Sequence, residues 1–184
     1  MKKQRTQNAT ASYWSNRLKA VDPLAAVLTY NAPRAINQAY DRWERASLSA
    51  NLPSLEKKRA LDLACGIGRI TIELAKAGAN VTAVDISASM LSACRVRARR
   101  AGVVNRVTLV ESPVHRLPND LGPFDVITCF GLLEHLKPSE RTACLSSAFV
   151  SLKKNGRMLV VVNNSACAFL KRRSAKSPKR FDGY

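Results

Sequence analysis

Residues 59–78 read R-A-L-D-L-A-C-G-I-G-R-I-T-I-E-L-A-K-A-G and carry the strongest structural signal of the chain. Residues 60–64 form a short apolar run with one acid, Asp62, which is typical of a strand buried on both faces of a parallel sheet. Residues 65–68 then predict a tight turn, because glycines accept positive φ angles and let a ligand approach the backbone. From Arg69 onward the apolar positions favour a buried helix, which the alanine and glycine at 77–78 end.

A strand, a glycine turn and a helix N-terminus in this order predict a nucleotide-type binding site. Free N–H groups of the turn and the positive end of the helix then point at the ligand. In the dinucleotide fingerprint G-x-G-x-x-G, Gly66 and Gly68 fill the first two positions, but the third holds Thr71. An acid inside the strand and Cys65 before the turn do not belong to that fingerprint either.

Residues 62–68, D-L-A-C-G-I-G, resemble instead the first motif of class I S-adenosylmethionine-dependent methyltransferases, commonly D-x-G/A-C-G-x-G. The resemblance implies that the cofactor is S-adenosyl-L-methionine and that this motif lies against it. The motif residues then expected at the cofactor are Asp62, Ala64, Cys65, Gly66 and Gly68. A dinucleotide site or a purely structural turn is the alternative.

The second predicted strand, residues 80–86, carries Asp85 at its carboxyl end. A carboxylate there can accept hydrogen bonds from both ribose hydroxyls of an adenosine ligand, and it follows the glycines at close to the expected interval of ~20 residues. The surrounding sequence V-D-I-S-A-S-M-L resembles the second motif of the same family. It implies that Asp85 binds the ribose, that Ile86 touches the adenine and that Met90 belongs to the same site. A mere helix cap is the alternative.

The third predicted strand, residues 107–111, leads into the loop S-P-V-H-R-L-P. In many relatives an Asp-Ala pair stands where this chain has Pro113 and Val114, and the acid binds the adenine amino group. Proline has neither an N–H group nor an acceptor side chain. The resemblance therefore puts Pro113 and Val114 at the cofactor, with the usual side-chain contact missing or supplied by a neighbour such as Ser112.

The fourth predicted strand, residues 124–130, is followed by G-L-L-E-H-L, and the combined pattern recurs in this family. The resemblance implies that the strand end offers a backbone carbonyl to the methionine amino group, which puts Cys129 and Phe130 beside the sulfonium. His135 is a candidate general base, since its unperturbed pKa lies near ~6.5. We favour the alternative that His135 orders the loop, because only some acceptors need a base.

The segment before the first strand divides into residues 1–12, predicted to be disordered, and residues 13–56, predicted to be helical, with one helix from about 34 to 50. In small-molecule methyltransferases of this class, N-terminal helices often pack over the ligand crevice. The candidate acceptor-site residues by this resemblance are Tyr13, Trp14, Tyr40 and Trp43. An equally weighted alternative is that these aromatic side chains dock the helices on the sheet.

A fifth strand is predicted over residues 157–163, after a helix at 139–152. The complete family fold has seven strands in the order 3-2-1-4-5-7-6, but here a basic tail, residues 171–184, follows and no strand 6–7 hairpin. Residues 158–162 would then be an apolar sheet edge, which is a template for pairing with another chain. We therefore expect either a fragment of a longer protein or self-association through the fifth strand.

The net charge is +17, from 30 Lys and Arg against 13 Asp and Glu. Arginines at 95, 97, 99, 100 and 106 lie around one predicted helix, but no aromatic residues are interleaved with them, so we favour a solvated surface over a nucleic-acid patch. No apolar run approaches the ~20 residues of a membrane span. The five scattered cysteines include no C-x-x-C pair, which predicts no metal site and reduced thiols in the cytoplasm.

Alternating strands and helices predict an α/β protein, a doubly wound, Rossmann-like parallel sheet in the order 3-2-1-4-5 within residues 57–170. Its ligand should lie over the carboxyl ends of the strands. The function expected from the resemblance is transfer of a methyl group to an oxygen, nitrogen or carbon of a small-molecule acceptor. A methyltransferase acting on RNA or other nucleic acid is one alternative, because of the charge. A non-catalytic or truncated cofactor-binding protein is the other, because of Pro113 and the missing hairpin.

Overall fold

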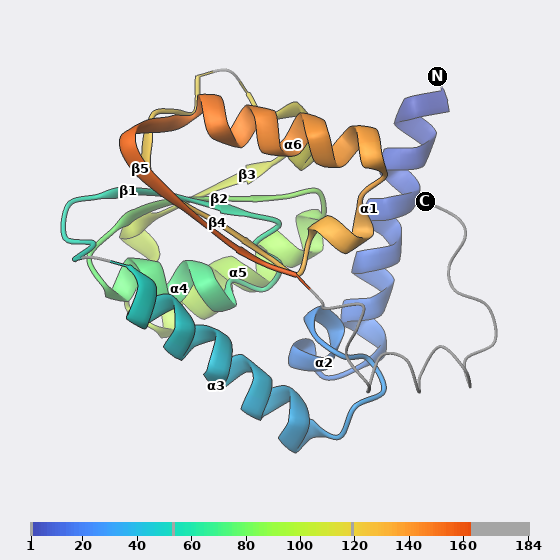
Figure 1. The fold of residues 1–184 in the computed structure, drawn as a ribbon. Helices are drawn as coiled ribbons and strands as arrows, with labels where there is room; N and C mark the ends of the chain where they lie inside the picture. The colour runs from blue at the N-terminus through green and yellow to red at the C-terminus, as the bar shows by residue number, and fades with distance from the viewer. Residues whose placement is uncertain (1, 53, 119, 163–184) are drawn as a thin grey trace.

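Five parallel strands form one sheet in the order β3-β2-β1-β4-β5 (Figure 1). The structure is a computed structural model that describes residues 2–52, 54–118 and 120–162. The strands are β1 (Arg59–Leu63), β2 (Asn80–Asp85), β3 (Val107–Glu111), β4 (Phe124–Phe130) and β5 (Leu152–Val161). This order confirms the predicted Rossmann-like sheet, in which the chain reverses direction across the sheet at β1.

Helices cover both faces of this sheet, with α3, α4 and α5 on one face and α6 on the other (Figure 1). Their bounds are α3 (Arg34–Asn51), α4 (Arg69–Lys76), α5 (Ala88–Arg100) and α6 (Pro138–Val150). Three short 3₁₀ turns complete the connections: η1 (Val104–Arg106), η2 (Val114–Arg116) and η3 (Leu133–His135). Because both faces are covered, the central strands are nearly continuous apolar runs, as the sequence indicates.

The core lies on the two sides of β1 and β4. Leu61 and Ile127 face α6, whereas Ala60 and Val126 pack with Leu74 of α4 on the opposite side. All five are at most 2% exposed. Since full burial of such a side chain contributes ~1.5–3 kcal/mol for the larger residues, this double-sided packing fixes the strand ends that carry the site.

The N-terminus differs from the sequence-based expectation. Residues 1–12 were expected to be disordered, but α1 (Lys2–Ala20) begins at Lys2 and α2 (Pro23–Val27) follows it. The stretch contains no glycine or proline and is rich in alanine, lysine, arginine and glutamine, which have favourable helix propensities. The Ser15 hydroxyl lies 3.0 Å from that of Ser87, so α1 is also tied to the start of α5. In Figure 1, α1 crosses the ends of the strands.

The fifth strand begins earlier than predicted, at Leu152 rather than at residue 157. Its pairing with β4 shifts register between Phe124, opposite Leu152, and Val126, opposite Arg157. The polar residues 153–156 fall in this irregularity, which explains why an apolar pattern did not reveal them. Among the described residues β5 pairs with β4 alone, while the predicted basic tail and the end of the predicted strand, residue 163, lie outside the described part of the chain.

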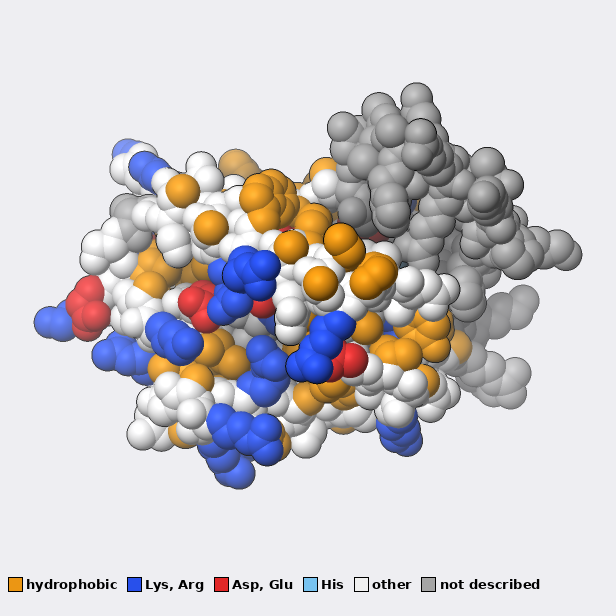
Figure 2. All heavy atoms as spheres, turned by 90° about the horizontal axis from the view of Figure 1, so that it is seen from below, with side chains coloured by type: hydrophobic (Ala, Val, Ile, Leu, Met, Phe, Trp, Pro, Cys, Tyr) orange, Lys and Arg blue, Asp and Glu red, His pale blue; other side chains and the backbone are white. Residues whose placement is uncertain are grey.

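The surface on the α3 side carries Lys and Arg side chains in several separate groups, interspersed with hydrophobic ones (Figure 2). None of the helices that the structure describes combines the length and apolar character needed to cross a membrane.

Candidate functional site

A cavity of about 530 Å³ opens at the carboxyl ends of β1, β2 and β4. Its volume lies within the range of ~300–1,000 Å³ that is usual for small-molecule sites. The glycine turn after β1 forms one wall, Gln7, Thr10 and Trp14 of α1 form another, and the start of α6 contributes a third. The cavity is therefore at the place where doubly wound sheets bind their ligands.

Most residues predicted for the site line this cavity. They are Trp14, Asp62, Ala64, Cys65, Gly66, Asp85, Ile86, Met90, Pro113, Val114, Phe130 and His135. Five predicted residues do not line it. Gly68 and Cys129 are buried outside the lining, and Tyr13 lies on α1. Tyr40 and Trp43 are on the exposed side of α3, where Trp43 is 55% exposed. The structure thus brings the motif residues together with one of the four candidate aromatic residues.

The turn after β1 requires glycine at two positions. Gly66 has φ +53° and Gly68 has φ +80°, a backbone conformation that residues other than glycine rarely adopt. A Cβ atom on Gly66 would lie 3.1 Å from Cγ1 of Val27, and one on Gly68 would collide with the Cys94 sulfur. The glycines therefore serve both the backbone conformation and the close approach of α2 and α5.

Asp85 holds the turn from the neighbouring strand. Its carboxylate accepts one hydrogen bond from the Gly66 N–H and another from the Ser87 N–H, each at 2.9 Å. Burial raises the pKa of Asp85, and these N–H donors act in the opposite direction. A carboxylate has about four acceptor positions, so capacity remains for hydroxyl groups of a ligand.

Asp62 is enclosed between two threonine hydroxyls. Thr71 of α4 donates to one carboxylate oxygen at 2.6 Å, and Thr128 of β4 donates to the other at 2.8 Å. Burial raises the pKa of Asp62 to about 6, although both hydrogen bonds lower it. Thr71 occupies the place of the third glycine in the dinucleotide fingerprint, so the departure from that fingerprint has a structural purpose. Sequence reasoning missed both threonines as partners of Asp62.

His135 lies at the mouth of the cavity, edge-on to Trp14, with ring centroids 5.1 Å apart. The side chain is exposed, yet the surrounding protein excludes enough water to lower the pKa of His135 below its usual value. The neighbouring Glu134 acts in the opposite direction. The guanidinium of Arg17, in turn, lies 5.5 Å from the Trp14 ring centroid. This arrangement joins α1 to η3.

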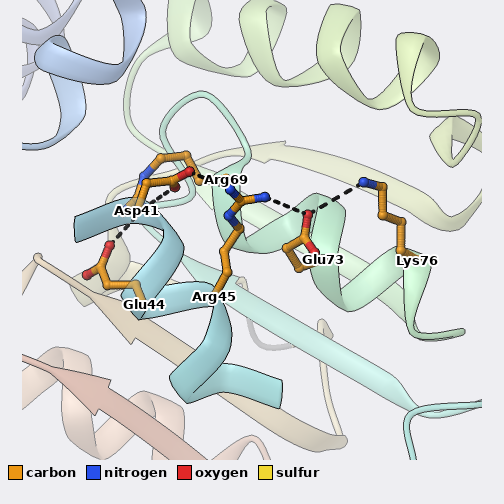
Figure 3. A network of polar contacts seen from close by, with 6 residues as sticks. All are labelled: Asp41, Glu44, Arg45, Arg69, Glu73 and Lys76. Atoms are coloured by element: carbon orange, nitrogen blue, oxygen red, sulfur yellow. Dashed lines mark hydrogen bonds and ion pairs between the residues drawn. The ribbon is translucent and has the colours of Figure 1, made fainter. Parts of the chain in front are cut away.

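An ion-pair network links α3 to α4, and its central residue Arg69 also lines the cavity (Figure 3). Nη1 of Arg69, the first residue of α4, lies 2.8 Å from Oδ1 of Asp41 and 2.7 Å from Oε2 of Glu44. The Glu44 contact is an ion pair without hydrogen-bond geometry. Burial raises the pKa of Glu44 despite the opposing charge of Arg69. Sequence reasoning missed this network, whose only signal is two acids three positions apart on the helix.

Further residues that line the cavity were also missed. They come from the connections after β3 and β4 and from the start of α6, and they include His115, Arg116, Leu132, Lys137 and Glu140. Their signal is their position after the carboxyl ends of two parallel strands. Within the described residues, no three His, Cys, Asp or Glu side chains are grouped so as to hold a metal ion.

A family model described as a methyltransferase domain matches residues 60–156. Among curated relatives, a ubiquinone biosynthesis O-methyltransferase of Marinobacter nauticus is 37% identical over 122 residues, covering 64% of this chain and 49% of that protein. A putative methyltransferase of Bacillus subtilis, YqeM, is 34% identical over 128 residues, covering 68% and 49%. The chain thus spans about half the length of these two relatives.

Solved structures show the same fold. The glycopeptide N-methyltransferase MtfA in complex with S-adenosyl-L-methionine superposes with a TM-score of 0.58 at 27% identity, over 64% of this chain and 52% of that one. A phosphoethanolamine N-methyltransferase of Haemonchus contortus gives 0.69 at 22% identity, over 84% and 31%. The family match spans 97 of the 184 residues and includes the glycine turn and Asp85. The chain therefore belongs to the methyltransferase-domain family, the class I S-adenosylmethionine-dependent methyltransferases.

Proposed function

We propose that this chain binds S-adenosyl-L-methionine in the cavity and directs its methyl group to an oxygen, nitrogen or carbon atom of a small-molecule acceptor. The observation that carries the proposal is Asp85, whose carboxylate lines the cavity at the end of β2 while it holds the turn through Gly66. The relatives named for ubiquinone biosynthesis and for glycopeptide methylation support a small acceptor.

The residues present fit this cofactor. Asp85 offers free acceptor positions to the ribose hydroxyls, and Ile86, Met90 and Val114 give an apolar surface for the adenine. Ser112, which was expected as a substitute for the missing acid, is buried and does not line the cavity. When bound, the cofactor supplies an electrophilic methyl group on a sulfonium. The task of the chain is to align the acceptor with that methyl and to exclude water.

For an acceptor that loses a proton, we propose His135 as the base. Its lowered pKa keeps the imidazole neutral near neutral pH, the form that accepts a proton. Trp14 holds the ring by its edge-on contact and covers the cavity from α1. His135→Ala should then reduce turnover without weakening cofactor binding, whereas equal turnover in the variant assigns His135 to ordering the loop.

Calorimetry with S-adenosylhomocysteine tests the proposal. We expect binding by the wild-type chain, and Asp85→Ala should weaken it by ~1–3 kcal/mol through loss of charge-assisted hydrogen bonds. Glu111→Ala is the matched control, because Glu111 is an exposed carboxylate at the end of the adjacent strand. Tighter binding of NAD than of S-adenosylhomocysteine would contradict the proposal. Binding without transfer to any acceptor in a screen would favour a non-catalytic role.

Nucleic acid is the second candidate acceptor. Arg95, Arg97, Arg99 and Arg100 are exposed on α5, and no ion pair to a carboxylate involves them within the described part of the chain. If they bind RNA, affinity should fall with salt with a slope of about −0.7 per neutralised phosphate on single strands. Binding that is absent at low salt would leave the small-molecule acceptor alone.

We also propose three features of the whole chain. Residues 13–56 act as a lid over the acceptor site, with Trp14 and Val27 reaching the cavity.

The chain self-associates through the edge of β5, where Val160 is 41% exposed. It works in the cytoplasm, a proposal supported by the four described cysteines, which are free thiols.

A further inference from the structure

We propose that the acceptor carries an anionic group, a carboxylate or a phosphate, and that Arg116 and Lys137 bind this group at the rim of the cavity. The inference rests on the proposed function, because it names the class of acceptor for the same site. The evidence is that some charged side chains of the cavity wall have polar partners within the protein, whereas others have none among the described residues.

The charges deep in the cavity have partners within the protein. Asp62 accepts from two threonine hydroxyls, and Asp85 accepts from two backbone N–H groups. Arg69 is 9% exposed and contacts both Asp41 and Glu44. None of these three lining groups is therefore a free charge that awaits an ion of opposite sign.

The rim is different. Arg116 on η2 and Lys137 at the start of α6 both line the cavity, and both side chains are exposed. Neither lies within ion-pair distance of a carboxylate among the residues that the structure describes. The nearby Glu140 instead accepts a hydrogen bond from the Lys137 backbone N–H at 3.1 Å. Two cations from separate elements thus line one cavity without an ion pair among the described residues, and the carboxylate that lies close to Lys137 is that of Glu140.

The placement of these cations points to the acceptor. Lys137 follows His135 by two residues in the chain, and both line the cavity. The carboxylate of Asp85 makes the ribose end of the cavity unfavourable for an anion, whereas the rim favours one. An arginine fork and a lysine ammonium together suit carboxylate and phosphate oxygens, and the net charge of +17 attracts anions toward the protein.

The test titrates the wild-type chain with three probes, benzoate, phenyl phosphate and neutral benzamide, each with and without saturating S-adenosylhomocysteine. We expect one bound anion per chain and at least about tenfold tighter binding of an anion than of benzamide. The ratio of benzoate to phenyl phosphate affinity separates the carboxylate from the phosphate. Arg116→Gln and Lys137→Gln should each weaken anion binding about tenfold, whereas the control Lys154→Gln, exposed on β5 away from the cavity, should not.

The competing role for these cations is binding of the carboxylate of the cofactor itself. Comparison of S-adenosylhomocysteine with methylthioadenosine, which lacks that carboxylate, separates the two roles. A loss of affinity for the first ligand alone in Lys137→Gln or Arg116→Gln would overturn the inference. So would equal binding of benzoate and benzamide, or an equal loss in Lys154→Gln. Failure of the wild type to bind S-adenosylhomocysteine would remove the proposed function, while the probe comparison without that ligand would still decide whether the rim binds anions.

Discussion

Asp62 is a carboxyl group that is only 2% exposed, at the centre of the sheet between Thr71 and Thr128. Its pKa rises from 3.8 to about 6 because burial disfavours the charged form. The native state therefore keeps this proton at pH values where the unfolded chain has released it. Stability from this group is consequently highest below pH 4 and is lost as the pH rises toward 6.

Replacement by asparagine tests this effect. The interval between pKa 3.8 and about 6 corresponds to ~3 kcal/mol, most of which the wild type should lose relative to Asp62→Asn between pH 4 and pH 7. Threonine hydroxyls can accept as well as donate, so the amide keeps partners. Denaturant unfolding of both proteins across this pH range measures the difference in their unfolding free energy. The contributions of the other titrating groups cancel in that difference. A constant difference would show that Asp62 ionises normally.

Gly68 combines a positive φ of +80° with a close approach to Cys94. Gly68→Ala should therefore cost ~1–2 kcal/mol for the left-handed backbone and a further ~1–3 kcal/mol for overpacking. Gly102→Ala is a matched control, because Gly102 has φ +72° but nothing within 4 Å of the added Cβ. Thermal or denaturant unfolding should rank Gly68→Ala as the less stable variant, and equal losses would leave backbone strain as the whole explanation.

At the scale of elements, the Arg69 network decides how α3 docks on α4. Removal of the guanidinium in Arg69→Met leaves Glu44, which is 1% exposed, without its cation, whereas Asp41 keeps its pair with Arg45. We therefore expect a loss of ~3–5 kcal/mol of unfolding free energy. The control is Arg45→Met. Arg45 also pairs with Asp41 but is 37% exposed, so its loss should cost ~0–1 kcal/mol.

A second substitution separates charge from packing. If the uncompensated carboxylate causes the loss, Glu44→Gln should restore part of the stability of Arg69→Met, because a neutral amide is less costly to bury. Denaturant unfolding of the wild type, the two single variants and the double variant gives the coupling free energy between the two substitutions. Purely additive losses would mean that α3 is held by its apolar contacts instead.

Some features of the fold could be predicted from a local sequence pattern, whereas others depend on contacts that form only on folding. β1, β2 and β4 were predictable because each is a local apolar run that ends in a glycine, an acid or a turn. The contacts of Arg69, Thr71 and Thr128 were not, because each depends on a partner that is near only after folding. The start of α1 was missed because its polar composition shows little apolar periodicity, although its helix propensity is high.

The whole molecule presents β5 as an edge within its described residues. Residues 158–161 pair on one side with β4, and Val160 is 41% exposed. We expect sedimentation velocity to show association that increases with protein concentration, and Val160→Lys to reduce it, since charge on an edge discourages pairing. Hydrogen exchange should slow at this strand as the dimer forms. A monomer at every concentration with protected amides there would contradict self-association.

α1 forms one side of the cavity, and its contacts with the rest of the chain include the Ser15–Ser87 hydroxyl contact and the edge-on ring contact of Trp14 with His135. We expect a bound nucleoside that sits between α1 and the strand ends to leave more readily when this helix moves away. We therefore expect the timing of the catalytic cycle to be governed by helix opening on the microsecond-to-millisecond scale. The demethylated product would then persist as a competitor for fresh cofactor, and this chain would respond to the ratio of the two in its surroundings.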